Sequence, residues 1–165
     1  MTPKMLAMDA IMIASAFAVT FGTWEQHTRP MVARWKLLLP PVCAVIATLA
    51  LVGYPDPRDL MDLQRWTAAV AGLLVGVARG ALLSLAHDKA HDTVRLRRAG
   101  DGFWLAIVLL VFVLVHAVIE VTLGTESPVE DLVEMVMLLS TGFLLGRGVT
   151  AWLRTGAAEH TDLYE

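Results

Sequence analysis

The chain has 165 residues, of which 56% are hydrophobic and only 18% are charged, and its mean hydropathy is +0.61. A soluble domain carries about 25% charged residues and a much smaller apolar share. A single cysteine excludes a disulfide scaffold, and a net charge of −3 argues against nucleic acid as a partner. The composition therefore indicates a small integral membrane protein whose first partner is the lipid bilayer.

Five apolar stretches are long enough to cross a bilayer, and together they form a single membrane domain over residues 1–165. At ~1.5 Å per residue each covers about 27–36 Å, close to a hydrocarbon core of ~30 Å. Because the backbone cannot stay unpaired in lipid, these stretches are expected to be helices. The predicted fold is all-α, a polytopic transmembrane bundle of five helices with spans at 5–24, 37–54, 66–86, 103–124 and 129–152.

Local signals refine the ends of these spans. Prolines are expected in the first turn of the second and fifth helices, and Asp56-Pro57 and Ser127-Pro128 read as helix starts. Gly124 is expected to end the fourth helix. Residues 87–92 are expected to continue the third helix beyond the membrane, residues 93–98 alternate as in a short strand, and residues 99–102 read as a turn. Aromatic residues at span ends predict an interfacial belt: Trp24, Trp35, Tyr54, Trp66, Trp104 and Trp152.

Lysine and arginine are unevenly divided between the two sides. Most of them fall in the first and third connections and in the C-terminal tail. The positive-inside rule then places the N-terminus outside and the C-terminus in the cytoplasm of a bacterial inner membrane, as a multi-pass protein. The charge order around the first span favours an uncleaved anchor over a signal peptide.

Small residues predict where the helices touch. Gly72, Gly76 and Gly80 recur every fourth residue in the third span, and Gly142 and Gly146 do so in the fifth. Lipid gives no hydrophobic drive for helix association, so close packing at such residues supplies it. Packing within one chain is the expected use, and a homodimer or a partner in a membrane complex is the alternative.

Ionisable side chains inside the spans predict polar sites. Each costs ~2.5–3.5 kcal/mol at mid-membrane, so they are expected to face the bundle interior or a wet cavity. They are Asp9, Arg79, His116, Glu120, Glu134 and Arg147. The residues toward the outer side are either capped by water at the interface or line a pocket that exchanges protons or holds a cation.

The two arginines call for separate interpretations. Arg147 is expected to extend to the headgroups. Arg79 lies on the glycine stripe and is expected to pair with a carboxylate of another helix or to bind an anionic headgroup.

Signals for metals and catalysis are weak. His87 and His91 would share a face of a continued helix, which makes them weak metal candidates without a third ligand, and a solvated helix end is the preferred interpretation. No cofactor is predicted, while haem or a metal ion stays open. The chain has no nucleophile elbow, phosphate-binding loop or paired cysteine, so no enzymatic activity is expected, and Cys43 reads as an apolar filler.

The order of several short motifs resembles the CcdC-like family of small bacterial integral membrane proteins. The motifs are Arg29-Pro30, Arg34-Trp35-Lys36, Gly72-Leu73-Leu74-Val75-Gly76, Val94-Arg95-Leu96-Arg97-Arg98 and the segment from Gly142 to Arg147. The resemblance implies a membrane location and a link to cytochrome c biogenesis. Members often carry a basic residue in the fourth helix, where this chain has His116 and Glu120.

These observations leave three functional hypotheses. The first is an accessory or scaffold protein associated with cytochrome c biogenesis. The alternative is a small transporter or proton-handling protein that uses the polar residues His116, Glu120, Glu134 and Asp9. The third is a redox subunit that binds haem or a metal ion.

Overall fold

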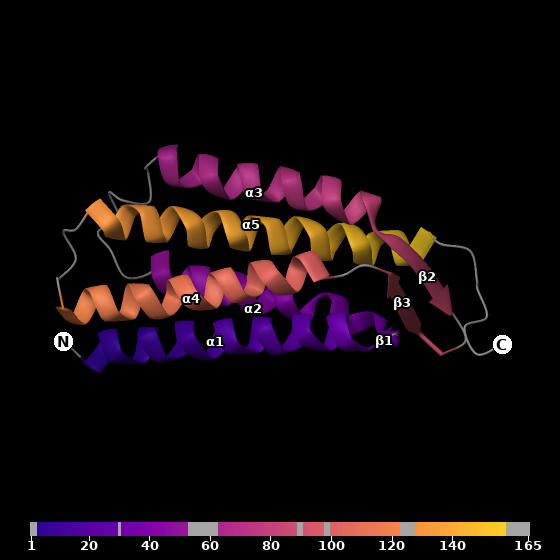
Figure 1. Ribbon diagram of the computed structural model, residues 1–165, viewed down its shortest axis with the longest axis horizontal. Coiled ribbons are helices and arrows are strands. Elements are labelled where there is room, and N and C mark those ends of the chain that lie inside the picture. The colour runs from indigo at the N-terminus through magenta and orange to yellow at the C-terminus, as the bar shows by residue number, and fades with distance from the viewer. Residues whose placement is uncertain are drawn as a thin grey trace.

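A computed structural model describes residues 3–29, 31–52, 63–88, 91–97, 100–122 and 128–157. In that part of the chain, five helices run along the long axis and a small sheet lies at one end, called here the sheet end, opposite the far end (Figure 1). The helices are α1 (Pro3–Thr28), α2 (Leu39–Val52), α3 (Leu63–Leu82), α4 (Gly100–Thr122) and α5 (Pro128–Ala157). The shorter elements are β1 (Met31–Ala33), the 3-10 helix η1 (Arg34–Leu37), β2 (Ser84–Asp88) and β3 (Thr93–Arg97).

Each predicted span overlaps one helix, so the prediction of five helices is confirmed. Pro40 and Pro41 lie in the first turn of α2, and Pro128 is the first residue of α5, where a missing backbone N–H costs little. The predicted helix signals at Asp56, Pro57, Gly124 and Ser127 lie outside the described residues.

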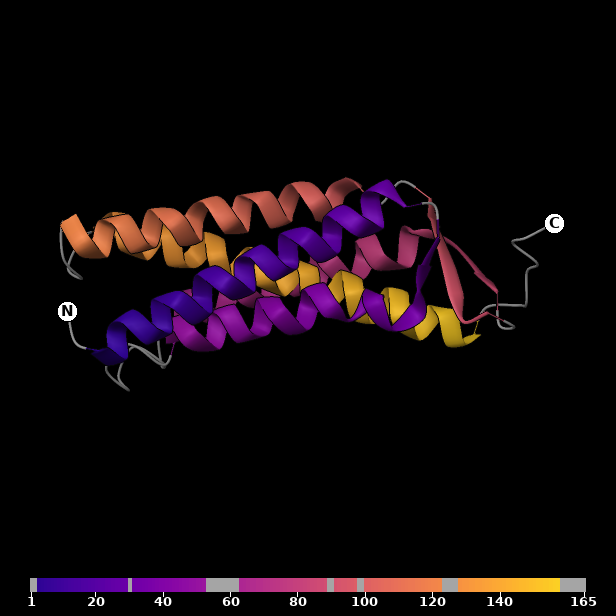
Figure 2. The same ribbon diagram turned by 90° about the horizontal axis from the view of Figure 1, so that it is seen from below.

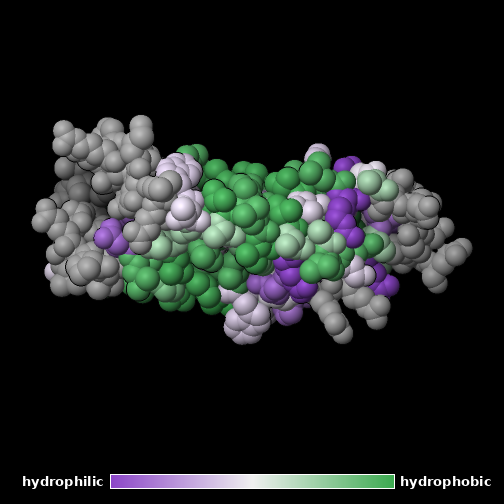
Figure 3. All heavy atoms as spheres, turned by 90° about the horizontal axis from the view of Figure 1, so that it is seen from above, coloured by the Kyte–Doolittle hydropathy of each residue, from purple (hydrophilic) through white to green (hydrophobic). Residues whose placement is uncertain are grey.

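Within the described residues, three helices are long and apolar enough to cross a membrane. The candidate segments are Leu6–Thr28, Gly100–Ile119 and Asp131–Ala157, and α3 contributes the shorter apolar segment Trp66–Leu82. Many large apolar side chains stay exposed around them, among them Phe21 at 69% and Leu74 at 64%. One face shows a broad hydrophobic band in its middle, with hydrophilic residues gathered toward the sheet end (Figure 3). This exposed band suits lipid as the surrounding solvent.

The tryptophans agree with an aromatic belt. Trp24, Trp35, Trp66 and Trp104 are each at least half exposed. Trp152 is partly covered, because the guanidinium carbon of Arg34 lies 4.9 Å from the centre of its ring. Indole rings at helix ends suit a boundary between apolar and polar surroundings.

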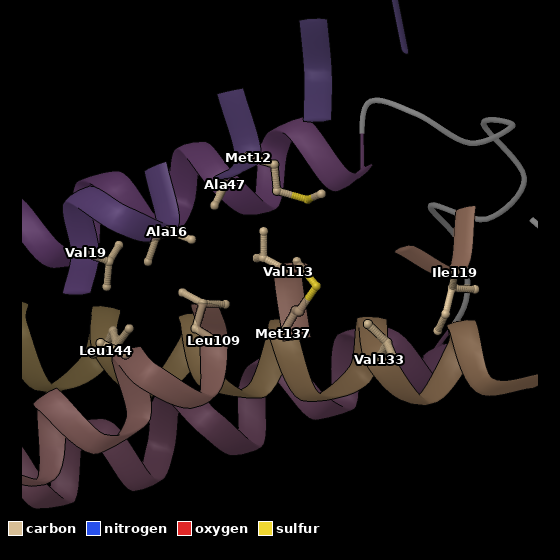
Figure 4. Packing of buried hydrophobic residues seen from close by; sticks show 12 residues of the cluster. Met12, Ala16, Val19, Ala47, Leu109, Val113, Ile119, Val133, Met137 and Leu144 are labelled. Carbon is tan, nitrogen blue, oxygen red and sulfur yellow. The ribbon is translucent and has the colours of Figure 1, made fainter. Parts of the chain in front are cut away.

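The main core lies between α1, α2, α4 and α5. It is built from side chains such as Met12, Leu109 and Met137, which converge from three helices (Figure 4). Cys43 packs against this core from α2, in agreement with its predicted role as an apolar filler. The helix α5 packs against α2, α3 and α4 and so forms the centre of the bundle.

The helix α3 lies outside that core and packs mainly against α5 (Figure 1). A Cβ atom added to Gly72 or Gly76 would collide with the carbonyl oxygen of Leu139 or Phe143. In return, a Cβ atom on Gly142 or Gly146 would collide with the carbonyl oxygens of Ala69 and Leu73, and Gly80 faces Arg147 in the same way. The predicted glycine contact is therefore confirmed, and it forms within the chain between two backbones.

The sheet is the main departure from an all-α fold. Its strand order is β1-β3-β2 with both pairs antiparallel, and Val94 stands opposite Val32 on one side and His87 on the other. Val32, Leu37 and Val94 form a small second core with Trp152 packed against it. The first and third connections, which the charge pattern assigned to one side of the membrane, therefore join at one end (Figure 2).

Two local predictions are wrong at this end. The third helix does not extend to residue 86 or through 87–92, because α3 ends at Leu82 and β2 pairs with β3. Residues 100–102 do not form a connecting turn between elements. They are the first three residues of helix α4. The predicted strand over 93–98 is confirmed for residues 93–97, which form β3, and residue 98 lies outside the described residues. Cross-strand pairing and burial of Val94 override the helical pattern of the third span.

Candidate functional site

Three ionisable side chains are buried toward the far end of the bundle. Asp9 of α1 is 8% exposed, His116 of α4 is 5% exposed and Glu134 of α5 is 7% exposed. They come from three helices that pack on one another, with α4 between α1 and α5. The prediction that these residues face the interior is confirmed.

Their neighbours in sequence place them at one level. Met12, Val113 and Met137 belong to one core cluster and point into the same space (Figure 4). Asp9, His116 and Glu134 each lie three residues from one of these, and in every case toward the far end. Three residues correspond to about 4.5 Å along a helix and to the same face. The three polar residues, called here the polar layer, thus lie one turn beyond this apolar level.

The polar layer combines an imidazole with two carboxyl groups in apolar surroundings. Histidine exchanges its proton near neutral pH, and carboxylates hold protons or cations when water is excluded. Glu120, the fourth predicted member, belongs to α4, but its side chain lies outside the described part of the structure.

Arg79 is not a member of the polar layer. It lies in the last turn of α3 at the sheet end, where its Nε atom is 2.6 Å from Oδ2 of Asp101. Asp101 and His116 are separated by fifteen residues of one helix, which is about 22 Å. The predicted partnership of Arg79 with a carboxylate of another helix is confirmed, and it lies at the opposite end of α4 from His116.

The same carboxylate also faces a second arginine. The Nε atom of Arg147 on α5 lies 3.6 Å from Oδ1 of Asp101, and the Arg147 side chain is only 6% exposed. The expectation that Arg147 extends to the headgroups is therefore wrong, because its guanidinium group packs against Gly102 of α4. Arg79, Asp101 and Arg147 form an interhelical group, called here the arginine cluster.

Asp101 is the site residue that sequence reasoning missed. The sequence pattern predicts a connecting turn at Asp101, whereas Asp101 lies in the first turn of α4, where a carboxylate is favoured by the helix dipole. The sequence does contain a signal for this pairing, which is depth in the predicted membrane. Arg79 and Arg147 both lie toward the cytoplasmic side of their spans, and Asp101 stands at the start of the next span on that side. Depth along the membrane, rather than distance in sequence, would have indicated the pairing.

Two further arginines hold the sheet end together. Nη1 of Arg154 on α5 donates to the carbonyl oxygens of Gly80 at 2.8 Å and of Leu83 at 2.7 Å, which caps the C-terminus of α3. Nε of Arg34 in η1 donates to Oγ1 of the fully buried Thr155 at 2.9 Å. These contacts join the end of α5 to the connection that follows α1 and to the connection that follows α3.

The histidine candidates for a metal lie on a strand and a turn rather than on one helix face. His87 is buried in β2, with Nε2 located 3.6 Å from Oδ1 of Asp92. Nδ1 of His91 lies 2.9 Å from Oδ2 of the buried Asp88, whose other oxygen accepts from the His91 backbone at 3.3 Å. Across the described ranges, no group of three or more metal-ligating side chains comes together. The predicted spacing of His87 and His91 on a helix is therefore wrong.

Comparisons with known proteins provide no relative for this chain. No protein-family model, curated protein or solved structure matches it. The polar layer, the arginine cluster and the sheet end are therefore the features of the molecule that bear on its function.

Proposed function

We propose that this protein is an accessory or scaffold subunit of a bacterial inner membrane, with no catalytic activity of its own. In this proposal the chain crosses the bilayer five times, with the N-terminus outside and the sheet end in the cytoplasm. A link to cytochrome c biogenesis follows from the family resemblance alone. The sheet end would present a folded surface to partner proteins.

The observation that carries the proposal is how firmly the helix ends are joined at the sheet end. Arg154 joins α5 to α3, Asp101 joins α4 to α3 and α5, and the sheet joins the connection after α1 to the one after α3. Along the bundle, α3 and α5 pack backbone to backbone at the glycines. A protein that works by sliding its helices past one another needs looser contacts, whereas a scaffold benefits from rigidity.

The partner surface offered by the sheet can be tested directly. Arg95 is exposed on β3, the central strand, and is the natural probe of that surface. Tagged protein purified in mild detergent is expected to retain partner proteins, identified by mass spectrometry, and Arg95→Glu is expected to lose them. Arg29→Glu, which reverses a charge on a side chain that is 65% exposed, is the matched control. A chain that always isolates alone would contradict the scaffold proposal.

The orientation can be tested with the single cysteine removed by Cys43→Ala. Thr122→Cys marks the far end at an exposed position beyond the apolar segment of α4, and Arg95→Cys marks the sheet end. A membrane-impermeant maleimide applied to spheroplasts is expected to label Thr122→Cys at once and Arg95→Cys only after permeabilisation. The opposite pattern would invert the proposed topology.

The second candidate function is proton or cation handling at the polar layer. It is favoured by the burial of Asp9, His116 and Glu134 at one level of the bundle. Its test is ion flux in proteoliposomes with a pH-sensitive dye, where Glu134→Gln would abolish a flux that the wild type supports. The redox alternative predicts a visible absorption band in the purified protein, and a colourless protein contradicts the haem form of that alternative.

A further inference from the structure

We propose that Ser140 binds a water molecule in the middle of the bundle, inside the core that α1, α2, α4 and α5 share. The ligand is water itself, held between the helices as a fixed part of the fold. This site lies apart from both the polar layer and the arginine cluster, so the proposal depends on neither candidate function.

Ser140 carries a buried hydroxyl group without a partner. The residue is 1% exposed, and within the described part of the chain its Oγ atom makes no hydrogen bond. An unpaired buried hydroxyl is unfavourable, and buried polar groups in folded proteins are regularly satisfied by an internal water. Ser140 therefore requires a small ligand that can donate and accept hydrogen bonds.

Other hydroxyl groups on these helices are satisfied locally. Six threonines donate to a backbone carbonyl three or four residues earlier in their own helix, at 2.6–3.0 Å, namely Thr20, Thr23, Thr28, Thr48, Thr122 and Thr155. This bond is the usual partner of a serine or threonine hydroxyl inside a helix. Ser140 does not make the corresponding bond to the carbonyl oxygen of Val136. Its hydroxyl group therefore depends on a partner from outside its own helix.

The contacts between α4 and α5 show what stands opposite Ser140. Gly102 of α4 lies against the guanidinium group of Arg147, and the two helices run in opposite directions (Figure 1). Leu109 is seven residues after Gly102, and Ser140 is seven residues before Arg147. Seven residues make about two helical turns and return to the same face. Leu109, which is fully buried in the main core, therefore lies opposite Ser140.

Helix α1 presents a small side chain at this level. The Oγ1 atom of Thr20 donates to the carbonyl oxygen of Ala106 on α4 at 3.4 Å, which aligns the two helices. Ala16 lies one turn from Thr20, and Leu109 lies one turn from Ala106, in the same direction along the bundle (Figure 4). Ala16 is 0% exposed and belongs to the main core. A methyl group thus stands where a larger side chain would fill the core.

Helix α2 adds a second alanine and further polar groups. The Oγ1 atom of Thr48 donates to Oγ1 of Thr141, the residue after Ser140, at 2.9 Å. Ala47, beside Thr48, therefore also lies at the level of Ser140, and it is 0% exposed. A buried water needs about two to four polar partners. The hydroxyl pair at this level offers such partners, and the small side chains suit a ligand of the size of water.

The experiment is hydroxyl-radical footprinting of the full chain in nanodiscs. An X-ray pulse splits water into radicals, and mass spectrometry then identifies the side chains that were oxidised. Leu109 is 0% exposed, so its oxidation in the wild type reports water inside the bundle. Ser140→Ala is expected to lower this oxidation about tenfold, the scale of one lost hydrogen bond. A variant that merely unfolds would raise the oxidation of buried side chains and cannot imitate this loss.

The matched control is Thr23→Ala. Thr23 is also 1% exposed, but its hydroxyl group already donates to the carbonyl oxygen of Val19 at 2.9 Å. Its removal is expected to change the oxidation of Leu109 less than about twofold, because no water bound at Ser140 is lost. The proposal is overturned when Leu109 stays unoxidised in the wild type, which would leave the Val136 carbonyl as the partner of Ser140. Equal oxidation in the wild type and Ser140→Ala also overturns it.

A second measurement tests whether Ser140 has space beside it. Ser140→Val places apolar bulk where the water is bound, and it is expected to abolish the oxidation of Leu109. The melting temperature should stay within about 4 °C of the wild type, because the added bulk replaces the water rather than neighbouring side chains. A larger fall would show a core that is already filled, and that result would overturn the proposal.

Discussion

The Nε atom of Arg79 lies 2.6 Å from Oδ2 of Asp101, which joins the last turn of α3 to the first turn of α4. This contact links two helices whose connection passes through the sheet, and Arg147 approaches the same carboxylate from α5. One carboxylate thereby ties three helices at the level where the bundle meets the sheet. Removing the Asp101 carboxylate should therefore destabilise the whole sheet end.

We predict that Asp101→Ala lowers the free energy of unfolding by about 1–2 kcal/mol in phosphatidylcholine nanodiscs. Breaking a buried pair costs more, but Arg79 and Asp101 are 39% and 23% exposed, and water screens part of the interaction. Denaturant-induced unfolding followed by tryptophan fluorescence measures the change. Asp92→Asn is the control, because Asp92 is 64% exposed and its φ of 47° suits asparagine. Equal loss in both variants would contradict the structural role of the cluster.

We predict that Gly76→Leu separates α3 from α5 and lowers stability by about 3 kcal/mol or more. The added side chain would meet the backbone of Phe143, which cannot move without displacing α5. Ala78→Leu adds bulk of the same kind to an exposed position of α3 and should be nearly neutral. The melting temperature in detergent reports both changes. An unchanged Gly76→Leu would show that the glycine contact is dispensable.

We predict that Arg154→Gln loosens the C-terminus of α3. The guanidinium group donates to the carbonyl oxygens of Gly80 and Leu83, so its loss leaves the last turn uncapped. Hydrogen–deuterium exchange should rise in the peptide that contains the end of α3 and the start of β2. Arg29→Gln removes a charge from an exposed side chain and should leave this peptide unchanged. Equal protection in wild type and Arg154→Gln would rule out the capping role.

We predict that His116 and Glu134 are energetically coupled. Residues in one polar group show interaction energies of about 0.5–3 kcal/mol in a double-mutant cycle, whereas distant residues add within about 0.5 kcal/mol. The cycle uses His116→Leu and Glu134→Gln, with unfolding free energy as the readout. The control cycle pairs Glu134→Gln with Asp101→Asn, which belongs to the opposite end of α4. If the changes in unfolding free energy were additive in the first cycle, His116 and Glu134 would be separate buried groups rather than parts of one polar layer.

Much of the helical architecture can be predicted from the sequence alone. Apolar length determined the number of helices, and Pro40, Pro41 and Pro128 fall at helix starts as expected. The four-residue spacing of the glycines predicted a close helix contact, and burial of Asp9, His116 and Glu134 followed from the cost of placing them in lipid. These properties are local in the chain or depend only on depth in the membrane, so they can be predicted from one sequence.

The sheet and the arginine cluster could not be predicted in the same way. The strand β1 pairs with β3, which lies sixty or more residues away in the chain, and residues 84–88 form a strand rather than a helix because β2 pairs with the other edge of β3. The role of Asp101 cannot be predicted from the sequence, because it depends on two arginines from other helices. Such choices depend on how helices are rotated and shifted against one another.

Residue order alone thus determined that the chain suits lipid, that it forms helices and that glycines line one contact, since each follows from transfer energies and helix geometry along a single segment. Only the tertiary structure decided that Gly76 faces Phe143 and that Asp101 lies between Arg79 and Arg147. The physical reason is that a buried charge or a bare backbone requires a partner, while the identity of that partner is determined by the packing of the whole bundle.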